Sequence, residues 1–154
     1  MSILEIDDST REFIRDHRVA RLATADGKGR PAVIPLCYAF DGESFYSSID
    51  EKPKSVGQRG LKRVRNIEAN PRVALVIDDY SEDWSNLVYV LVSGVASIIL
   101  PGDREGEHAQ AVALLRGKYP QYASMAIDER MIIKIAPTRI KRWGARQAES
   151  LRSR

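Results

Sequence analysis

Apolar and polar residues alternate with a period of two in several short segments of the chain, a pattern typical of half-buried β-strands. The first such segment, Val19 to Ala25, is followed by Asp26-Gly-Lys-Gly and then by a second, Pro31 to Phe40, which predicts a hairpin. Asp41-Gly42 marks another hairpin and leads into a third strand from Ser44 to Ile49. The prolines of the second strand cannot donate hydrogen bonds to a sheet, so we expect that strand at an edge or at a bulge.

The period then changes to that of a helix. Leu61, Val64 and Ile67 fall on one helical face between Arg59 and Ala69, and Asn70-Pro71 ends this helix. Four more strands are expected, at Arg72 to Asp78, Val88 to Leu100, Met131 to Ile135 and Ile140 to Trp143.

Two other helices are predicted from their capping residues. Ser9 can cap a helix that ends near Arg18, and Asp103 can cap one that buries Ala109, Val112 and Ala113. The two histidines lie in these helices and are expected at the surface.

Six or seven strands joined mainly by hairpins predict a mainly β fold with short helices, an antiparallel barrel, rather than a sheet of alternating strands and helices. The 154 residues suit a single domain over 1–154, with 144–154 expected as a frayed tail. No glycine-rich loop stands between a strand and a helix, which argues against the common nucleotide-binding motifs.

Composition narrows the class of protein further. Hydrophobic residues make up 44% and charged residues 29% of the chain, an ordinary globular mixture. No apolar run is long enough for a membrane span, and the N-terminal residues do not resemble a signal peptide, so we expect a cytoplasmic protein with no membrane partner. One cysteine and two histidines leave no internal disulfide and no Cys/His zinc set.

The net charge of +3 is unevenly distributed. Residues 52–72 contain seven basic residues against one acidic, and 139–154 contain six against one. Such concentration predicts an anionic partner for a small region. Nucleic acid is disfavoured, because the basic helix lacks the interleaved aromatic residues that stack on bases.

The candidate chemistry lies where the third strand meets the basic helix. Ser47 and Ser48 end the strand, and the helix presents Lys62 and Arg65 on one flank and Arg63 on the other. Hydroxyls, backbone N–H groups and guanidinium groups are what a phosphate monoester requires. A solvated basic helix with no ligand explains the same charge pattern.

These segments resemble the pyridoxamine 5′-phosphate oxidase-like split β-barrel proteins. The resemblance covers about Phe13 to Gly144. Within that group the chain is most similar to a subfamily that depends on the deazaflavin coenzyme F420. The segments that carry this similarity are EKPK at 51–54, RVRNIEANPRVAL at 63–75 and DYSEDWSNL at 79–87.

The resemblance implies a homodimer with a flavin or deazaflavin at the interface. Lys62 and Arg63 match the positions that supply phosphate contacts, together with Ser47 and Ser48. Relatives that bind FMN carry a basic residue near the end of the second strand, where this chain has Leu36-Cys37-Tyr38, and this departure favours coenzyme F420 over FMN.

The remaining implied contacts concern the tail and the ring of the cofactor. Lys54, with Lys52 and Arg59, would meet the anionic tail of F420, and Trp84 and Trp143 would approach the ring system, the latter in the partner subunit. Each tryptophan has a simpler explanation: Trp84 anchors its own loop, or Trp143 belongs to an ordinary edge strand.

We therefore expect an F420-dependent oxidoreductase that transfers a hydride to a small conjugated organic substrate. No residue pattern identifies a catalytic acid or base, and the acidic loop near Asp83 lacks the spacing of a calcium site. The alternatives are an FMN-dependent oxidase or reductase of the same fold and a non-catalytic protein that binds a tetrapyrrole or a phosphorylated ligand.

Overall fold

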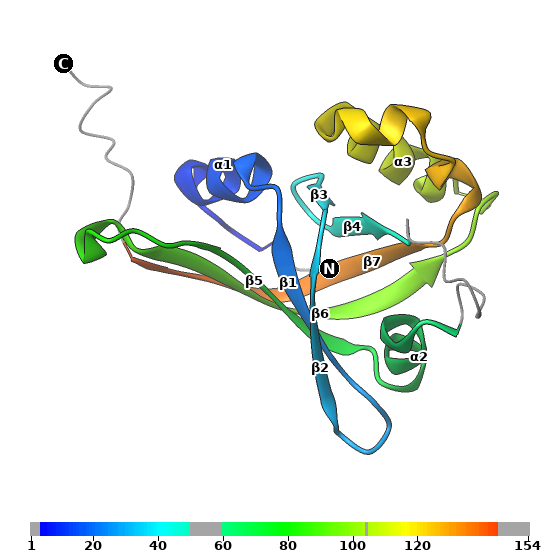
Figure 1. Cartoon of the computed structure of the whole chain (residues 1–154), viewed down its shortest axis with the longest axis horizontal. Coiled ribbons are helices and arrows are strands. Elements are labelled where there is room, and N and C mark those ends of the chain that lie inside the picture. The colour runs from blue at the N-terminus through cyan, green and yellow to red at the C-terminus, as the bar shows by residue number, and fades with distance from the viewer. Residues whose placement is uncertain (1–3, 50–59, 104, 145–154) are drawn as a thin grey trace.

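The computed structural model describes residues 4–49, 60–103 and 105–144. Its strands form one strongly curved sheet, with α1 (Asp8–Asp16) and α3 (Glu107–Lys118) above it and α2 (Lys62–Ala69) below it in the view of Figure 1. Within the described part, no helix is long and apolar enough to cross a membrane. The expected tail at 144–154 lies outside the described residues apart from Gly144, the last residue of the final strand.

The sheet has seven strands in the described ranges, and every pairing is antiparallel. The strands are β1 (Ala20–Ala25), β2 (Pro31–Leu36), β3 (Ala39–Phe40), β4 (Phe45–Ser48), β5 (Arg72–Asp79), β6 (Val88–Ile99) and β7 (Ile132–Gly144). Three short 3₁₀ turns complete the elements: η2 (Trp84–Asn86), η3 (Pro120–Ser124) and η4 (Ile127–Glu129). The predicted mainly β, antiparallel split barrel is confirmed.

The strand order β2-β1-β5-β6-β7-β4-β3 places two consecutive strands at opposite edges of the sheet. The predicted single strand Pro31 to Phe40 is in fact two strands, separated by Cys37 and Tyr38. The expectation of an edge position is correct, because β2 pairs on one side only, with β1. The chain therefore crosses between the two edges at Cys37 and Tyr38, which curls the sheet into a half-barrel.

Adjacent residues of β4 point to opposite faces of the sheet and both are buried. Phe45 joins the main core with Ile14, Leu22 and Val64, which draws α1 and α2 onto the barrel. Tyr46 belongs instead to a second core beneath α3. A strand buried on both faces explains why β4 can carry inward-facing serines without exposing them.

The helices begin and face differently from the sequence prediction. Asp7, not Ser9, caps α1, since its carboxylate accepts a hydrogen bond from the backbone N–H of Thr10 at 2.7 Å. Ala109 and Ala113 are exposed, whereas α3 buries Ala111 and His108. The predicted surface position of His108 is wrong, and its Nε2 lies 2.5 Å from the carbonyl oxygen of Arg130.

The last two predicted strands form one strand, β7. It pairs along its length with β6 and accommodates Pro137 through a bulge opposite Ser93 and Gly94. The hydroxyl of Thr138 donates to the Ser93 carbonyl at 3.1 Å, which satisfies one backbone group at the irregularity. A bulge thus joins into one strand the two segments, 131–135 and 140–143, that the sequence predicted separately.

Gly94→Ala should lower the free energy of unfolding by about 1–3 kcal/mol. An added Cβ at Gly94 would lie 2.8 Å from the carbonyl oxygen of Ala136, so the two long strands would have to separate. Urea unfolding measures the change, and Ser97→Ala on an exposed position of the same strand serves as the control. Equal unfolding midpoints for the two variants would contradict the close approach of the strands at the bulge.

Candidate functional site

A cavity of about 190 Å³ lies between the edge strand β2, the end of β4 and the start of α2. Ser47 and Ser48 line it together with Arg63, and Ile34, Pro35 and Leu36 form its apolar side. The structure thus brings three of the residues predicted from the sequence to one place. Whether they bind a ligand remains a prediction.

The two serines have different hydrogen-bonding roles. The Ser47 hydroxyl donates to the carbonyl oxygen of Cys37 at 2.7 Å and so holds the chain where it leaves β2. The Ser48 hydroxyl is buried and has no hydrogen-bond partner among the described residues. Leaving a buried polar group unpaired costs about 1–3 kcal/mol, so Ser48 is the residue whose hydroxyl a ligand would satisfy.

The basic residues of α2 also divide into two groups. Arg63 is half-buried and lines the cavity, whereas Lys62 and Arg65 are exposed and do not line it. The helix is fixed by Val64 and Ile67 in the core and by Asn66, whose side-chain amide donates to the Thr24 hydroxyl at 3.0 Å.

Asn66 was not identified by the sequence analysis. Its signal is a polar residue beside the apolar positions of a short helix, where a buried amide needs a partner. Its bond to β1 sets the rotation of α2 and thereby turns Arg63, rather than Arg65, toward the serines.

The dimensions of the cavity restrict what can occupy it. About 190 Å³ accommodates a phosphate group, but sites for drug-sized ligands span about 300–1,000 Å³. A tricyclic ring attached to that phosphate would have to lie on the outer side of β2. The described residues that line the cavity would contact such a ring from one side only, so a single chain leaves its other side uncovered.

The two tryptophans lie far from this cavity. Ser48 pairs with Ile132 at the start of β7, and Trp143 is the last residue but one of the same strand, roughly 35 Å away along it. Trp143 stacks on Tyr89 of β6 with ring centroids 5.5 Å apart, and it is 50% exposed. A single chain therefore does not bring it to the serines.

Trp84 opens the 3₁₀ turn η2 at the same end of the sheet, seen at the left of Figure 1. The turn is set by Asp83, whose carboxylate accepts hydrogen bonds from the backbone N–H and the hydroxyl of Ser85. These bonds lower the pKa of Asp83. The Trp84 side chain is 72% exposed, so Asp83 rather than burial of the indole fixes this turn.

Two further expectations concern residues around the site. Lys54, like Lys52 and Arg59, lies outside the described residues. No group of three or more His, Cys, Asp or Glu side chains suited to a metal ion occurs in the described ranges.

Comparisons with known proteins identify the family. The family model for pyridoxamine 5′-phosphate oxidase matches residues 6–144. A 5a,11a-dehydrotetracycline/5a,11a-dehydrooxytetracycline reductase of Streptomyces rimosus is 29% identical over 133 residues, which cover 86% of this chain and 78% of the reductase.

Two solved structures share the fold. HutZ, a heme storage protein of Vibrio cholerae, superposes with a TM-score of 0.70 at 17% identity, covering 92% of this chain and 95% of HutZ. A protein named F420 reductase superposes with a TM-score of 0.59 at 22% identity, covering 89% and 98% of the two chains. The half-barrel topology and the match over residues 6–144 show that the chain belongs to the pyridoxamine 5′-phosphate oxidase family.

Proposed function

We propose that this protein is an oxidoreductase that uses coenzyme F420 to transfer a hydride to a small conjugated organic substrate. The unpaired, buried hydroxyl of Ser48 beside Arg63 is the observation that carries the proposal. Support for redox chemistry comes from the family match and from the similarity to a reductase, and the F420 reductase with the same fold supports the choice of cofactor.

The residues of the cavity fit the phosphodiester of the coenzyme. Ser48 would donate its hydroxyl proton to a phosphate oxygen, and Arg63 would neutralise the charge with N–H donors. A reduced deazaflavin held there would supply the hydride. The apolar residues Val33 and Pro35, which lie on the outer face of β2, would exclude water from one side of the ring and hold its orientation.

A second copy of the chain would complete the site. The outer face of the sheet carries a row of paired residues, Ser93, Ala74, Ala23 and Val33, that crosses four strands, and Leu91 lies on the next row. Val33 is 64% exposed and Leu91 39% exposed. Small and apolar residues on an open sheet face beside the edge strand β2 are suited to dimerisation.

Such a dimer would also explain the exposed tryptophans. Trp84 and Trp143 lie too far along the sheet to reach the cavity of their own chain, but they could cover a cofactor held by the partner's cavity. In this arrangement the phosphate and ring contacts of one cofactor come from both chains.

The alternatives differ in ligand. FMN carries a phosphate that the same cavity would accept. The shared fold with HutZ, a heme storage protein, is compatible with the alternative of a non-catalytic protein that binds a tetrapyrrole. To test the proposal, the protein is mixed with reduced F420 and a conjugated ketone such as 2-cyclohexenone, and oxidation of the coenzyme is monitored by its absorbance. Turnover supports it, whereas tight heme binding without turnover would favour the non-catalytic alternative.

Ser48→Ala should stabilise the ligand-free protein and weaken its binding of a phosphate-bearing cofactor. The substitution removes an unpaired buried hydroxyl, which gives about 1 kcal/mol of stability, and it removes a donor to the phosphate. Ser47→Ala is the matched control and should lower the free energy of unfolding by about 0.5–1.5 kcal/mol, because the Cys37 carbonyl loses its donor. Unfolding curves and cofactor titrations give both values. A destabilised Ser48→Ala variant that binds FMN and F420 normally would contradict this role.

F420 should bind more tightly than FMN, and Arg63→Gln should weaken both by about 10- to 150-fold. The extra anionic groups of the F420 tail would meet basic residues beyond the phosphate, so the preference should shrink as salt rises. Fluorescence and absorbance titrations at two salt concentrations measure these affinities, with Arg65→Gln as the exposed control on the same helix. Equal affinities in low salt would favour the FMN-dependent alternative.

Light scattering should give twice the 17.3 kDa mass of the chain. Leu91→Asp should shift the protein toward a monomer and weaken cofactor binding, because it places a carboxylate in the proposed interface. Leu100→Asp, at an exposed leucine just beyond β6, is the control and should change neither. A monomeric parent protein that binds cofactor at full affinity would refute the shared site.

A further inference from the structure

A second hollow, larger than the serine cavity, lies between α1, α3 and the turn from β3 to β4. Its volume is about 780 Å³. Phe40 and Tyr46 form its floor, Leu114 and Lys118 its α3 side, and Arg15 its α1 side. None of these residues lines the serine cavity.

The outer face of α3 explains how this hollow arises. The helix buries one stripe of residues, including Val112 and Leu115, against the second core. Gln110, Ala113, Leu114 and Gly117 follow one another at helical spacing on another face, and they line the hollow. Leu114 is 38% exposed. Together with Phe40 it gives the hollow apolar walls on two sides.

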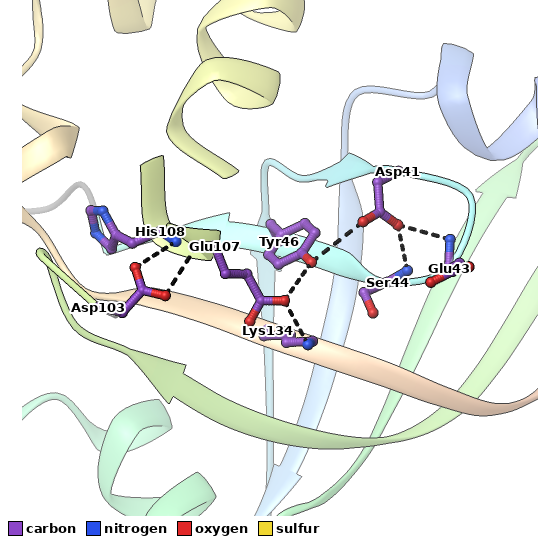
Figure 2. Close-up of polar contacts among 8 residues, drawn as sticks. All are labelled: Asp41, Glu43, Ser44, Tyr46, Asp103, Glu107, His108 and Lys134. Atoms are coloured by element: carbon purple, nitrogen blue, oxygen red, sulfur yellow. Dashed lines mark hydrogen bonds and ion pairs between the residues drawn. The ribbon is translucent and has the colours of Figure 1, made fainter. Parts of the chain in front are cut away.

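The one acidic side chain that lines the hollow, Asp41, forms hydrogen bonds within its own turn, as Figure 2 shows. Asp41 accepts hydrogen bonds from the backbone N–H groups of Glu43 and Ser44, and its other carboxylate oxygen lies 3.4 Å from the Tyr46 hydroxyl. Tyr46 also donates toward Glu107, which pairs with Lys134. The carboxylates of Asp41 and Glu107 are therefore engaged within the protein.

The two cations of the hollow are placed differently. Arg15 is exposed and forms no ion pair with the described residues, and its guanidinium lies beside the turn at Gly42. Lys118 is half-buried, with its Nζ donating to the His17 carbonyl at 2.5 Å and standing 3.9 Å from the centre of the Tyr38 ring. An ammonium group has three donors, so Lys118 can also bind an anion.

We propose that this hollow is a second small-molecule site, which binds an amphipathic organic anion. The apolar ring body of such a ligand would lie against Phe40 and Leu114, and its acidic group would lie between Arg15 and Lys118. The basis is charge complementarity: two cations and apolar walls line the space, and its one lining carboxylate, Asp41, accepts hydrogen bonds from the backbone of its own turn. The site lies outside the proposed cofactor site and does not depend on it.

The charge of Lys118 gives this site a pH dependence. Burial, with a smaller contribution from Arg18, lowers the pKa of Lys118 to about 8, while Cys37 and Asp16 act in the opposite direction. Other titratable groups near Lys118 are Tyr119 and three residues that line the hollow, Arg15, Asp41 and Tyr46. Burial raises the pKa of Tyr46 well above its usual range. Lys118 therefore loses its positive charge as the pH rises through about 8, and anion binding should weaken over the same interval.

A matched pair of fluorescent probes tests the proposal on the full chain. 1-Anilinonaphthalene-8-sulfonate carries an anionic group, and N-phenyl-1-naphthylamine is the same apolar body without it. Arg15→Gln and Lys118→Met should each weaken sulfonate binding about fivefold and change binding of the neutral probe less than twofold. Leu114→Glu should weaken both. Lys28→Met, in the exposed β1–β2 turn, removes the same charge elsewhere and should change neither.

The pH arm separates this site from other places where the probe can bind. Affinity for the sulfonate probe should fall several-fold between pH 7 and pH 9 in the parent protein, and this fall should disappear in Lys118→Met. Sulfonate binding that is unchanged in Arg15→Gln, Lys118→Met and Leu114→Glu would overturn the proposal. So would a probe that FMN or F420 displaces and that no longer binds to the Arg63→Gln variant, because it would then occupy the serine cavity. Equal effects on the two probes would exclude a site for an acidic group.

Discussion

The structure depends on the burial of a crossing segment in which backbone groups cannot pair in the sheet. Between β2 and β3, Cys37 and Tyr38 pass from one edge of the half-barrel to the other, and Tyr38 is fully buried. Backbone N–H and C=O groups in such a place need partners from side chains. The Tyr119 hydroxyl accepts from the Tyr38 N–H at 3.0 Å and lies 2.9 Å from the Tyr38 carbonyl, and Ser47 donates to the Cys37 carbonyl.

The same crossing separates the two candidate sites and shapes both. Because Ser47 is committed to Cys37, Ser48 is the serine whose hydroxyl is left for a ligand in the smaller cavity. On the opposite side, the Tyr38 ring supports the ammonium of Lys118 at the edge of the larger hollow. Tyr119 lies next to Lys118 in the chain, and burial raises its pKa to about 12, which keeps its hydroxyl protonated as a donor over the physiological range.

The parts of the fold that the sequence predicted are those set by local pattern. Strand periodicity, the Asp26 and Asp41 turns and the Asn70-Pro71 helix stop all involve contacts between near neighbours, and the structure contains each of them. The parts that were missed depend on distant partners. His108 is buried because the Arg130 carbonyl lies within hydrogen-bond distance of its ring, and β7 continues past Pro137 because a bulge at Thr138 keeps it paired with β6. Ser9 and Asp7 are both good caps, but Asp7 caps the helix, and the Ser9 hydroxyl accepts a hydrogen bond from the distant Arg142 at 2.9 Å.

The candidate site follows the same division. The cluster of basic residues on α2 was visible in the sequence, but the choice among them was not, because it depends on the bond from Asn66 to Thr24 of β1. The position of β1 in the curved sheet makes that bond possible. Because β1 lies between the edge strand β2 and β5, a helix packed across β1 places one flank over the β2 edge of the sheet. A helix of eight residues turned by a single residue would direct a different basic side chain at the serines. The anion site proposed for this cavity would therefore depend less on the number of basic residues than on one buried amide, Asn66, that fixes the rotation of the helix.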